Sequence, residues 1–246
     1  MTFDVRKDGP ALAVSLALAA GAKAAYSRVG PDELRVLTAP TQALVGLMTG
    51  IDFSYEGGYG YVSFAHRLVI AKSCTGVNYL LAAFGLLAFT VIPAVAGARR
   101  KLAVVPVLAA GACAATVVVN AIRIALAVAL HDGGFAWGWL DAARVHRLAG
   151  IVVYFGSLIA LQSVARFVLA RHHADGRITP LPLAPLIAYG AIAIAVPLLN
   201  GALAARPRLF AEHTAWVVGV AVLLSALFVL VPEPVRKVTL GASETS

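Results

Sequence analysis

Six long apolar stretches constrain the fold of this 246-residue chain more than any other feature. A membrane-spanning helix needs about 20 mostly apolar residues, because the hydrocarbon core is about 30 Å thick and a helix rises about 1.5 Å per residue. With 60% hydrophobic and 13% charged residues, the chain is too apolar for an ordinary soluble domain. The sequence predicts an all-α integral membrane protein, one multi-pass domain over residues 1–246, with about six transmembrane helices at 10–29, 74–97, 102–130, 146–170, 183–204 and 213–232.

The basic residues lie in short clusters between these stretches and predict the orientation. The net charge of +8 is not gathered along one face, so we interpret the Lys and Arg residues as topology signals and expect no nucleic-acid partner. Placing both termini in the cytoplasm satisfies the positive-inside rule at four clusters: 6–7, 99–101, 166–177 and 236–237. Arg206, Arg208 and Lys23 do not fit this placement. The expected location is the inner (plasma) membrane of the cell.

The first 24 residues allow two interpretations. Arg6 and Lys7, the apolar run that follows and the small residues around Lys23 resemble a cleavable signal peptide. Apolar character resumes only weakly at Ala25, so we expect a retained first helix, with cleavage as the alternative. In both cases the segment that follows lies on the outer side of the membrane.

That segment, residues 30–73, is the least membrane-like part of the chain. "TAPTQALVGLMTG" predicts a short helix in the membrane interface. In "FSYEGGYGYVSFAHRLVIAKS", aromatic and β-branched residues flank a Gly57-Gly58 turn with partial alternation, a pattern that favours a β-hairpin. We therefore expect an interfacial helix and a hairpin on the outer face, between the first and second spans.

The predicted topology brings polar groups from three spans to one outer depth. Cys74 begins the second span, Asn120 and Arg123 lie in the outer half of the third, and His146 begins the fourth. A charge within a span costs at least about 2.5 kcal/mol on insertion scales unless it faces a partner or a polar cavity. Arg123 is therefore a site candidate, and snorkelling to the outer headgroups is the alternative. Asn120, three residues earlier on the same helix face, could orient the guanidinium or bridge to another helix.

Cys74 differs from the second cysteine by its location. It lies at the predicted start of a helix, where free N–H groups and the helix dipole favour a thiolate, and Lys72 is two residues away. Cys113 falls near mid-membrane, where a free cysteine is usually an inert small hydrophobe. A function for cysteine must therefore rest on one thiol.

The sequence predicts neither a metal site nor another cofactor. Two cysteines form no CxxC pair and no disulfide framework. Four of the histidines outside the fourth span lack a convincing ligand spacing: His66, His131, His172 and His173.

His146 is the candidate acid and base. A neutral imidazole near a thiol could take the thiol proton and return it to a leaving amine. Gly150 and Tyr154 follow at intervals of four and share one helix face with His146. That face carries a small residue, Gly150, and then a polar one, Tyr154. The residues alone barely separate His146 from His131 or His66 in this role.

Three segments resemble the signature blocks of the exosortase/archaeosortase family. They are "SCTGVNYL" at 73–80, "NAIRIALAVAL" at 120–130 and "HRLAGIVVYF" at 146–155, and they follow the family's order. The resemblance covers about residues 70–156 and is greatest to the exosortase K branch.

The resemblance implies a membrane-embedded cysteine protease or transpeptidase that acts at the outer face. Its partners would be exported proteins with a C-terminal motif, a transmembrane helix and a basic tail, together with membrane lipids. On the matching positions Cys74 would be the nucleophile, Arg123 the activating or oxyanion-stabilising cation and His146 the acid and base. Supporting or substrate-binding roles fall to Asn78, Asn120, Gly150 and Tyr154.

Three other functions stay open at this point. A transporter or channel could use Arg123 to bind an anion, although the repeated halves typical of many transporters are not visible. An assembly partner for envelope machinery could use Arg123 structurally. An intramembrane hydrolase would cleave the tail without transferring it.

Overall fold

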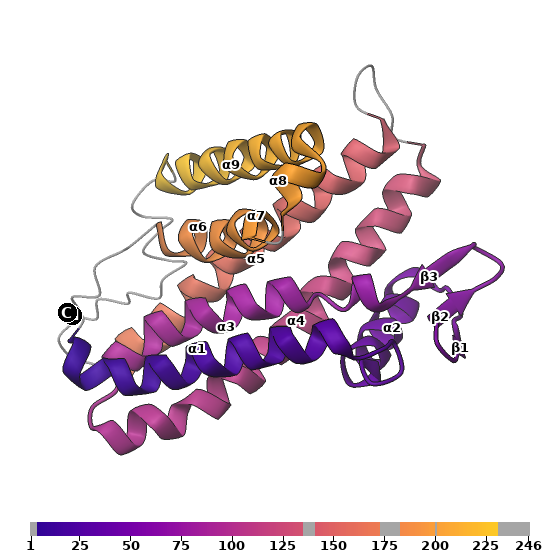
Figure 1. The fold of residues 1–246 in the computed structure, drawn as a ribbon. Helices are drawn as coiled ribbons and strands as arrows, with labels where there is room; N and C mark the ends of the chain where they lie inside the picture. Colours follow the sequence, from indigo (N-terminus) through magenta and orange to yellow (C-terminus); the bar gives the residue numbers. More distant parts are fainter. Residues whose placement is uncertain (1–3, 135–140, 173–182, 200, 231–246) are drawn as a thin grey trace, which may run out of the picture.

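Long helices form one bundle, and a short helix and a small sheet lie at one end of it (Figure 1). The computed structural model describes residues 4–134, 141–172, 183–199 and 201–230. The elements are α1 (Val5–Arg28), α2 (Arg35–Thr49), β1 (Ser54–Glu56), β2 (Gly60–Ser63), β3 (Leu68–Ile70), η1 (Lys72–Cys74), α3 (Val77–Val91), η2 (Ile92–Ala94), α4 (Ala98–Asp132), α5 (Ala142–His172), α6 (Leu183–Gly190), η3 (Ala191–Ala195), α7 (Val196–Leu199), α8 (Ala202–Ala205) and α9 (Pro207–Leu230).

The helices confirm an all-α membrane protein, with one difference in the number of spans. In the described residues, five helical segments are long and apolar enough to cross a membrane: Val5–Arg28, Lys72–Ala94, Ala98–Asp132, Arg144–Arg171 and Pro207–Leu227. The predicted span at 183–204 is a shorter apolar helix, Ala184–Leu198. The structure describes residues 183–199 and 201–230 in this region, so the span predicted at 183–204 stays a prediction.

The helix in the predicted fifth span changes its backbone geometry for a local reason. Pro197 has no N–H and cannot donate to the carbonyl of Ala193 four residues earlier, and the backbone widens to a π-helix over Ala191–Ala195. The Nε2 atom of His213 in α9 lies 3.2 Å from that carbonyl oxygen and can satisfy it. Gly201, at φ +78°, then turns the chain towards α8. In the described residues the helical backbone is continuous over 183–199.

The small sheet confirms the predicted hairpin and adds a strand to it. Strand order is β1-β2-β3, both pairs antiparallel, with Tyr55 opposite Tyr61 and Val62 opposite Val69. The sequence pattern did not predict β3 as a separate strand, because its three residues are too few to show a period. The predicted interfacial helix is α2, which packs against α4.

One end of the bundle gathers the segments that carry the candidate residues. The last turn of α1 and the start of α3 lie there beside α2 and the sheet, and α4 passes next to them before it continues beyond the sheet to its end near the start of α5 (Figure 1). A hydrophobic cluster joins these parts through Val45 of α2, Tyr61 of β2, Ile70 of β3 and Ala121 of α4, and Cys74 packs against it. Helix α2 and the sheet therefore form a cap on this end.

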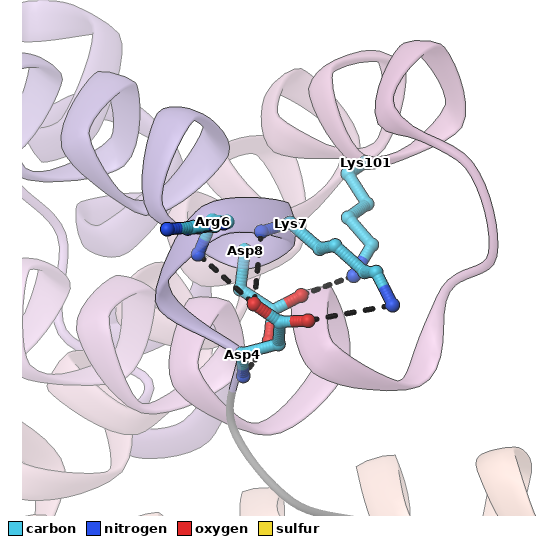
Figure 2. Close-up of polar contacts among 5 residues, drawn as sticks. All are labelled: Asp4, Arg6, Lys7, Asp8 and Lys101. Carbon is cyan, nitrogen blue, oxygen red and sulfur yellow. Dashed lines mark hydrogen bonds and ion pairs between the residues drawn. The ribbon is translucent and has the colours of Figure 1, made fainter.

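The opposite end holds a buried ion pair between α1 and α4. Asp8 is 2% exposed and Lys101 is 6% exposed, and the ammonium donates to the Asp8 carboxylate (Figure 2). The other Asp8 oxygen accepts from the backbone N–H of Asp4, 2.9 Å away. Ala11 and Leu12 of α1 belong to the main hydrophobic core. Helix α1 therefore packs as a member of the bundle, and retention of residues 1–24 stays the prediction.

Candidate functional site

Cys74 lies in a tight turn before α3 and not in the first turn of that helix. Its N–H donates to the carbonyl of Ala71 at 2.8 Å, which closes the 3-10 turn Lys72–Cys74. Gly76 then adopts φ +71°, and α3 begins only at Val77. The predicted helix start at Cys74 is therefore three residues early, because the left-handed glycine separates the two helical turns. The half-buried thiol lies 3.9 Å from Ser73 Oγ.

Asn120 holds this turn against the transmembrane helices. The side chain is fully buried, at 0% exposed. Its Nδ2 donates to the carbonyl oxygen of Cys74, and its Oδ1 accepts from the hydroxyl of Tyr154 at 2.9 Å. One amide thus connects the cysteine turn, α4 and α5. Of the two roles expected for Asn120, bridging to another helix is the one these contacts fulfil.

Two glycines permit this close packing. A Cβ on Gly76 would lie 3.0 Å from Thr116 Cγ2 and 3.2 Å from Asn120 Cγ, and the positive φ also disfavours other residues. A Cβ on Gly150 would lie 3.0 Å from Arg123 Nε. Gly76 therefore lets the cysteine turn approach α4, and Gly150 makes room on α5 for the arginine.

Arg123 packs its guanidinium against an aromatic ring. The central carbon lies 5.2 Å from the centroid of Tyr154, and the positive charge also acts on His146. Among the ion pairs of the described residues, none involves Arg123. A half-buried cation without a carboxylate partner can stabilise an anionic group that enters from outside.

His146 lies one helical turn before Gly150, on the same face of α5, and its side chain is exposed. The next residue, Arg147, faces α9 and lies 3.5 Å from Glu212, which also pairs with Arg144 at 3.2 Å. These ion pairs attach the start of α5 to α9. No hydrogen bond joins His146, Cys74 and Arg123 to one another within the described part of the chain.

The competing histidines have different surroundings. His131, at the end of α4, is 80% exposed and pairs with Asp132 at 3.4 Å. His66 is exposed in the turn between β2 and β3. Neither makes a hydrogen bond or ion pair with Cys74 or Arg123 among the described residues. His146 differs from both in its place on α5, one helical turn before Gly150, which packs against Arg123.

Asn78 does not join the network around Asn120. Its side chain is exposed, and its Oδ1 accepts from Lys23 Nζ of α1 at 2.9 Å. The contact also accounts for Lys23, which did not fit the predicted topology, because the ammonium has a polar partner near the end of α1.

Tyr79 is a residue of this region that the sequence pattern did not single out. Tyr79 is 1% exposed and stacks on Tyr154 with ring centroids 5.1 Å apart. A tyrosine inside an apolar stretch near the polar residues was the signal that could have identified it. In the described residues, no group of three or more His, Cys, Asp or Glu side chains could hold a metal ion.

The comparison with protein families covers this whole arrangement. Residues 10–163 match the family model described as transmembrane exosortase. The matched range contains the cysteine turn, Asn120, Arg123, His146 and Tyr154. Searches of the curated proteins and of the solved structures found no match.

Proposed function

Because the chain belongs to the transmembrane exosortase family, we propose that it is a membrane-embedded cysteine peptidase or transpeptidase. It cleaves the C-terminal sorting tail of exported proteins at the outer face of the membrane and transfers the new C-terminus to an envelope acceptor. Its termini lie in the cytoplasm, and it belongs to the exosortase K branch.

The observation that carries the proposal is the hydrogen-bond network of Asn120. A buried amide that binds the backbone of Cys74 and the side chain of Tyr154 keeps the thiol turn close to the helix face that bears Arg123. Catalytic groups need such support, because a displacement of about 1 Å can cost about 100-fold in rate.

The three proposed catalytic residues divide the acyl-transfer chemistry among them. His146 accepts the thiol proton of Cys74, and the thiolate attacks the scissile carbonyl to form a tetrahedral intermediate. Arg123 stabilises the negative oxygen of that intermediate. The C–N bond then breaks, His146 returns the proton to the departing amine, and the thioester remains on Cys74. Attack by an acceptor amine releases the thiol, and attack by water would give hydrolysis.

The location of Cys74 suits a substrate that is itself anchored in the membrane. A tail with its own transmembrane helix diffuses in the plane of the bilayer and presents the peptide segment beside the helix at the membrane surface. Cys74 is at the end of the bundle, next to the cap of α2 and the sheet, where such a segment could enter.

A cysteine pair supplies the test. Cys74→Ala should abolish processing of a reporter that ends in a sorting tail, whereas Cys113→Ala, which changes the other free cysteine, should leave it intact. With the unaltered chain, a tail peptide should form a covalent adduct that hydroxylamine removes. Normal processing by Cys74→Ala would contradict the thiol mechanism. The mass of the released C-terminus separates transfer, which adds a group, from hydrolysis, which leaves a free carboxylate.

A non-enzymatic anion site is the second candidate, because Arg123 has no carboxylate partner among the described residues. In that case Cys74→Ala and His146→Gln would leave the function of the protein in the cell unchanged, and only Arg123→Gln would impair it.

A further inference from the structure

An apolar groove runs along α1 and continues between α3 and the broken helix that follows α5. The groove has a volume of about 540 Å³. Its walls come from α1, from α3 and from the segment 184–196, and the lining residues are apolar except for Ser15 and Lys23. Ser15 already donates to the carbonyl of Ala11 at 2.9 Å. The polar group that remains available to a ligand is therefore Lys23, at one end of the groove.

The groove has the length of one membrane leaflet. From Leu12 to Lys23 the α1 wall covers 12 residues, whose 11 helical steps span about 17 Å along the axis. Half of the hydrocarbon core is about 15 Å. Three of the lining side chains, Leu16, Phe89 and Ile187, are more than half exposed, so the groove is open along its apolar side.

Two ammonium groups lie where the groove meets the candidate functional site. Lys23 Nζ is 5.4 Å and Lys72 Nζ is 4.9 Å from the centre of the Tyr26 ring. Lys23 donates to Asn78, and Lys72 donates to the carbonyl of Val29 at 2.6 Å. Each ammonium has three donors, so both keep donors for a further acceptor. No ion pair involves either lysine among the described residues.

We propose that this groove binds one anionic glycerophospholipid, with acyl carbons along α1 and α3 and the phosphate between Lys23 and Lys72. Charge complementarity selects the headgroup, because two cations without carboxylate partners flank one end of an otherwise apolar channel.

The lipid site is independent of the proposed peptidase chemistry, although it adjoins it. Lys72 belongs to the same turn as Cys74, and Asn78 follows in the first turn of α3. The headgroup thus lies beside the cysteine turn, while the acyl chain lies in the apolar groove along α1 and α3.

Native mass spectrometry of the delipidated full-length chain tests the site. We use an equimolar mixture of dioleoylphosphatidylglycerol and dioleoylphosphatidylcholine as the probe. The unaltered chain should retain one phosphatidylglycerol in preference to phosphatidylcholine. Lys23→Gln with Lys72→Gln should reduce that preference by about 30-fold, and each single change by about fivefold, if each ammonium contributes as a juxtamembrane cation does. The control Arg99→Gln with Arg100→Gln, at the other end of the bundle, should leave it unchanged.

A second pair of variants tests the acyl channel. A side chain on Gly85, which lines the groove, would meet no atom within 4 Å, so Gly85→Leu fills the channel without a clash near the backbone. It should reduce the retention of both lipids. Gly111→Leu is the matched control, because Gly111 also has open space and lies on α4, outside the groove.

Three results would overturn the lipid site. They are an equal retention of both lipids by the unaltered chain, an unchanged preference in the double lysine variant, and the same lipid retention in Gly85→Leu as in Gly111→Leu.

A photoreactive group at Ala19 provides a fourth check. Crosslinking to an added apolar helical peptide that phosphatidylglycerol does not suppress would assign the groove to a protein helix. None of these readouts requires activity, so failure of the lipid site and failure of the peptidase proposal are distinguishable.

Discussion

Asn120 donates from its side-chain amide to the backbone carbonyl of Cys74, across 46 positions of sequence. The same side chain accepts from Tyr154 at 2.9 Å, so one buried residue connects three segments of the chain. The contact explains how an exposed turn at the end of a helix bundle can keep one position. It also makes Asn120 and Tyr154 positioning residues for Cys74.

Tyr154→Phe should destabilise the protein by about 1–3 kcal/mol, because it leaves the buried Oδ1 of Asn120 without its donor. Thermal unfolding in detergent measures the effect. Tyr79→Phe is the matched control, because the buried Tyr79 hydroxyl has no hydrogen-bond partner in the described residues, and its loss should be nearly neutral. A double-mutant cycle with Asn120→Ala should show a coupling energy of about 0.5–3 kcal/mol. Additive effects would contradict the network.

Gly150→Ala should reduce tail processing with little loss of helix stability. The new methyl group would lie 3.0 Å from Arg123 Nε and displace the guanidinium from its position over Tyr154. Gly156→Ala is the control on the same helix, because its Cβ would meet nothing within 4 Å. The control should stabilise α5 by up to about 1 kcal/mol and leave processing unchanged. Equal rates of tail processing in the two variants would show that Gly150 does not support the site.

His146→Gln should lower the rate of tail processing by about 100-fold to 10,000-fold, the usual contribution of a general acid and base. His131→Gln and His66→Gln change exposed histidines that make no hydrogen bond or ion pair with Arg123 or Cys74 in the described residues, and both should retain activity. Initial rates of reporter cleavage give the comparison. A larger loss for His131→Gln than for His146→Gln would reassign the base.

Removing one partner of the Asp8–Lys101 pair should destabilise the protein much more than replacing both partners by apolar residues (Figure 2). Lys101→Met leaves a buried carboxylate unpaired and should destabilise the protein by about 3 kcal/mol or more. Asp8→Leu combined with Lys101→Met removes both charges and should recover most of that loss. Midpoints of thermal unfolding in detergent test the order. A double variant that is less stable than the single variant would contradict a pair held mainly by mutual neutralisation.

The cap formed by α2 and the sheet should loosen in acid. Hydrogen bonds from the Tyr55 hydroxyl and the Gly58 N–H hold the pKa of Asp32 below its ordinary value of 3.8. A carboxylate with a lowered folded pKa contributes stability above its unfolded pKa, and that contribution is lost as the pH falls through the folded value. The protection of the sheet amides against hydrogen exchange, relative to their intrinsic rates, should therefore fall below about pH 4.

Asp32→Asn is the control for this pH dependence, because it removes the titrating group and keeps a similar shape. The variant should show weaker protection of the sheet at neutral pH and a flatter response to acid. A response as steep as that of the unaltered chain would attribute the loosening to another group.

Much of the fold could be predicted, because the thickness of the bilayer sets the minimum length of an apolar stretch that can span it. Four predicted spans overlap α1, α3, α4 and α5, and a fifth overlaps α9. The hairpin followed from the Gly57-Gly58 turn and its flanking residues. At 183–204 the described helix is shorter than the predicted span, and a π-helical turn precedes Pro197 within it.

The candidate site could be predicted only in part. Arg123 and Asn120 were identifiable because polar side chains in a span need partners. The partner of each residue could not be predicted, because several polar groups lie at the same predicted depth. Asn78, near the cysteine in sequence, binds Lys23 of α1 instead, because its position on α3 directs it to the other side of the helix.

The amino-acid sequence by itself determined the membrane class, most of the spans, the cap and the set of polar residues at one end of the bundle. These depend on local quantities, which are hydrophobic length, turn propensity and the cost of a charge in hydrocarbon. Only the tertiary structure decided that Asn120 holds Cys74, that Gly150 makes room for Arg123, and that a leaflet-length groove ends between two lysines. Those facts depend on how helices far apart in sequence rotate and approach each other, which local preferences leave open.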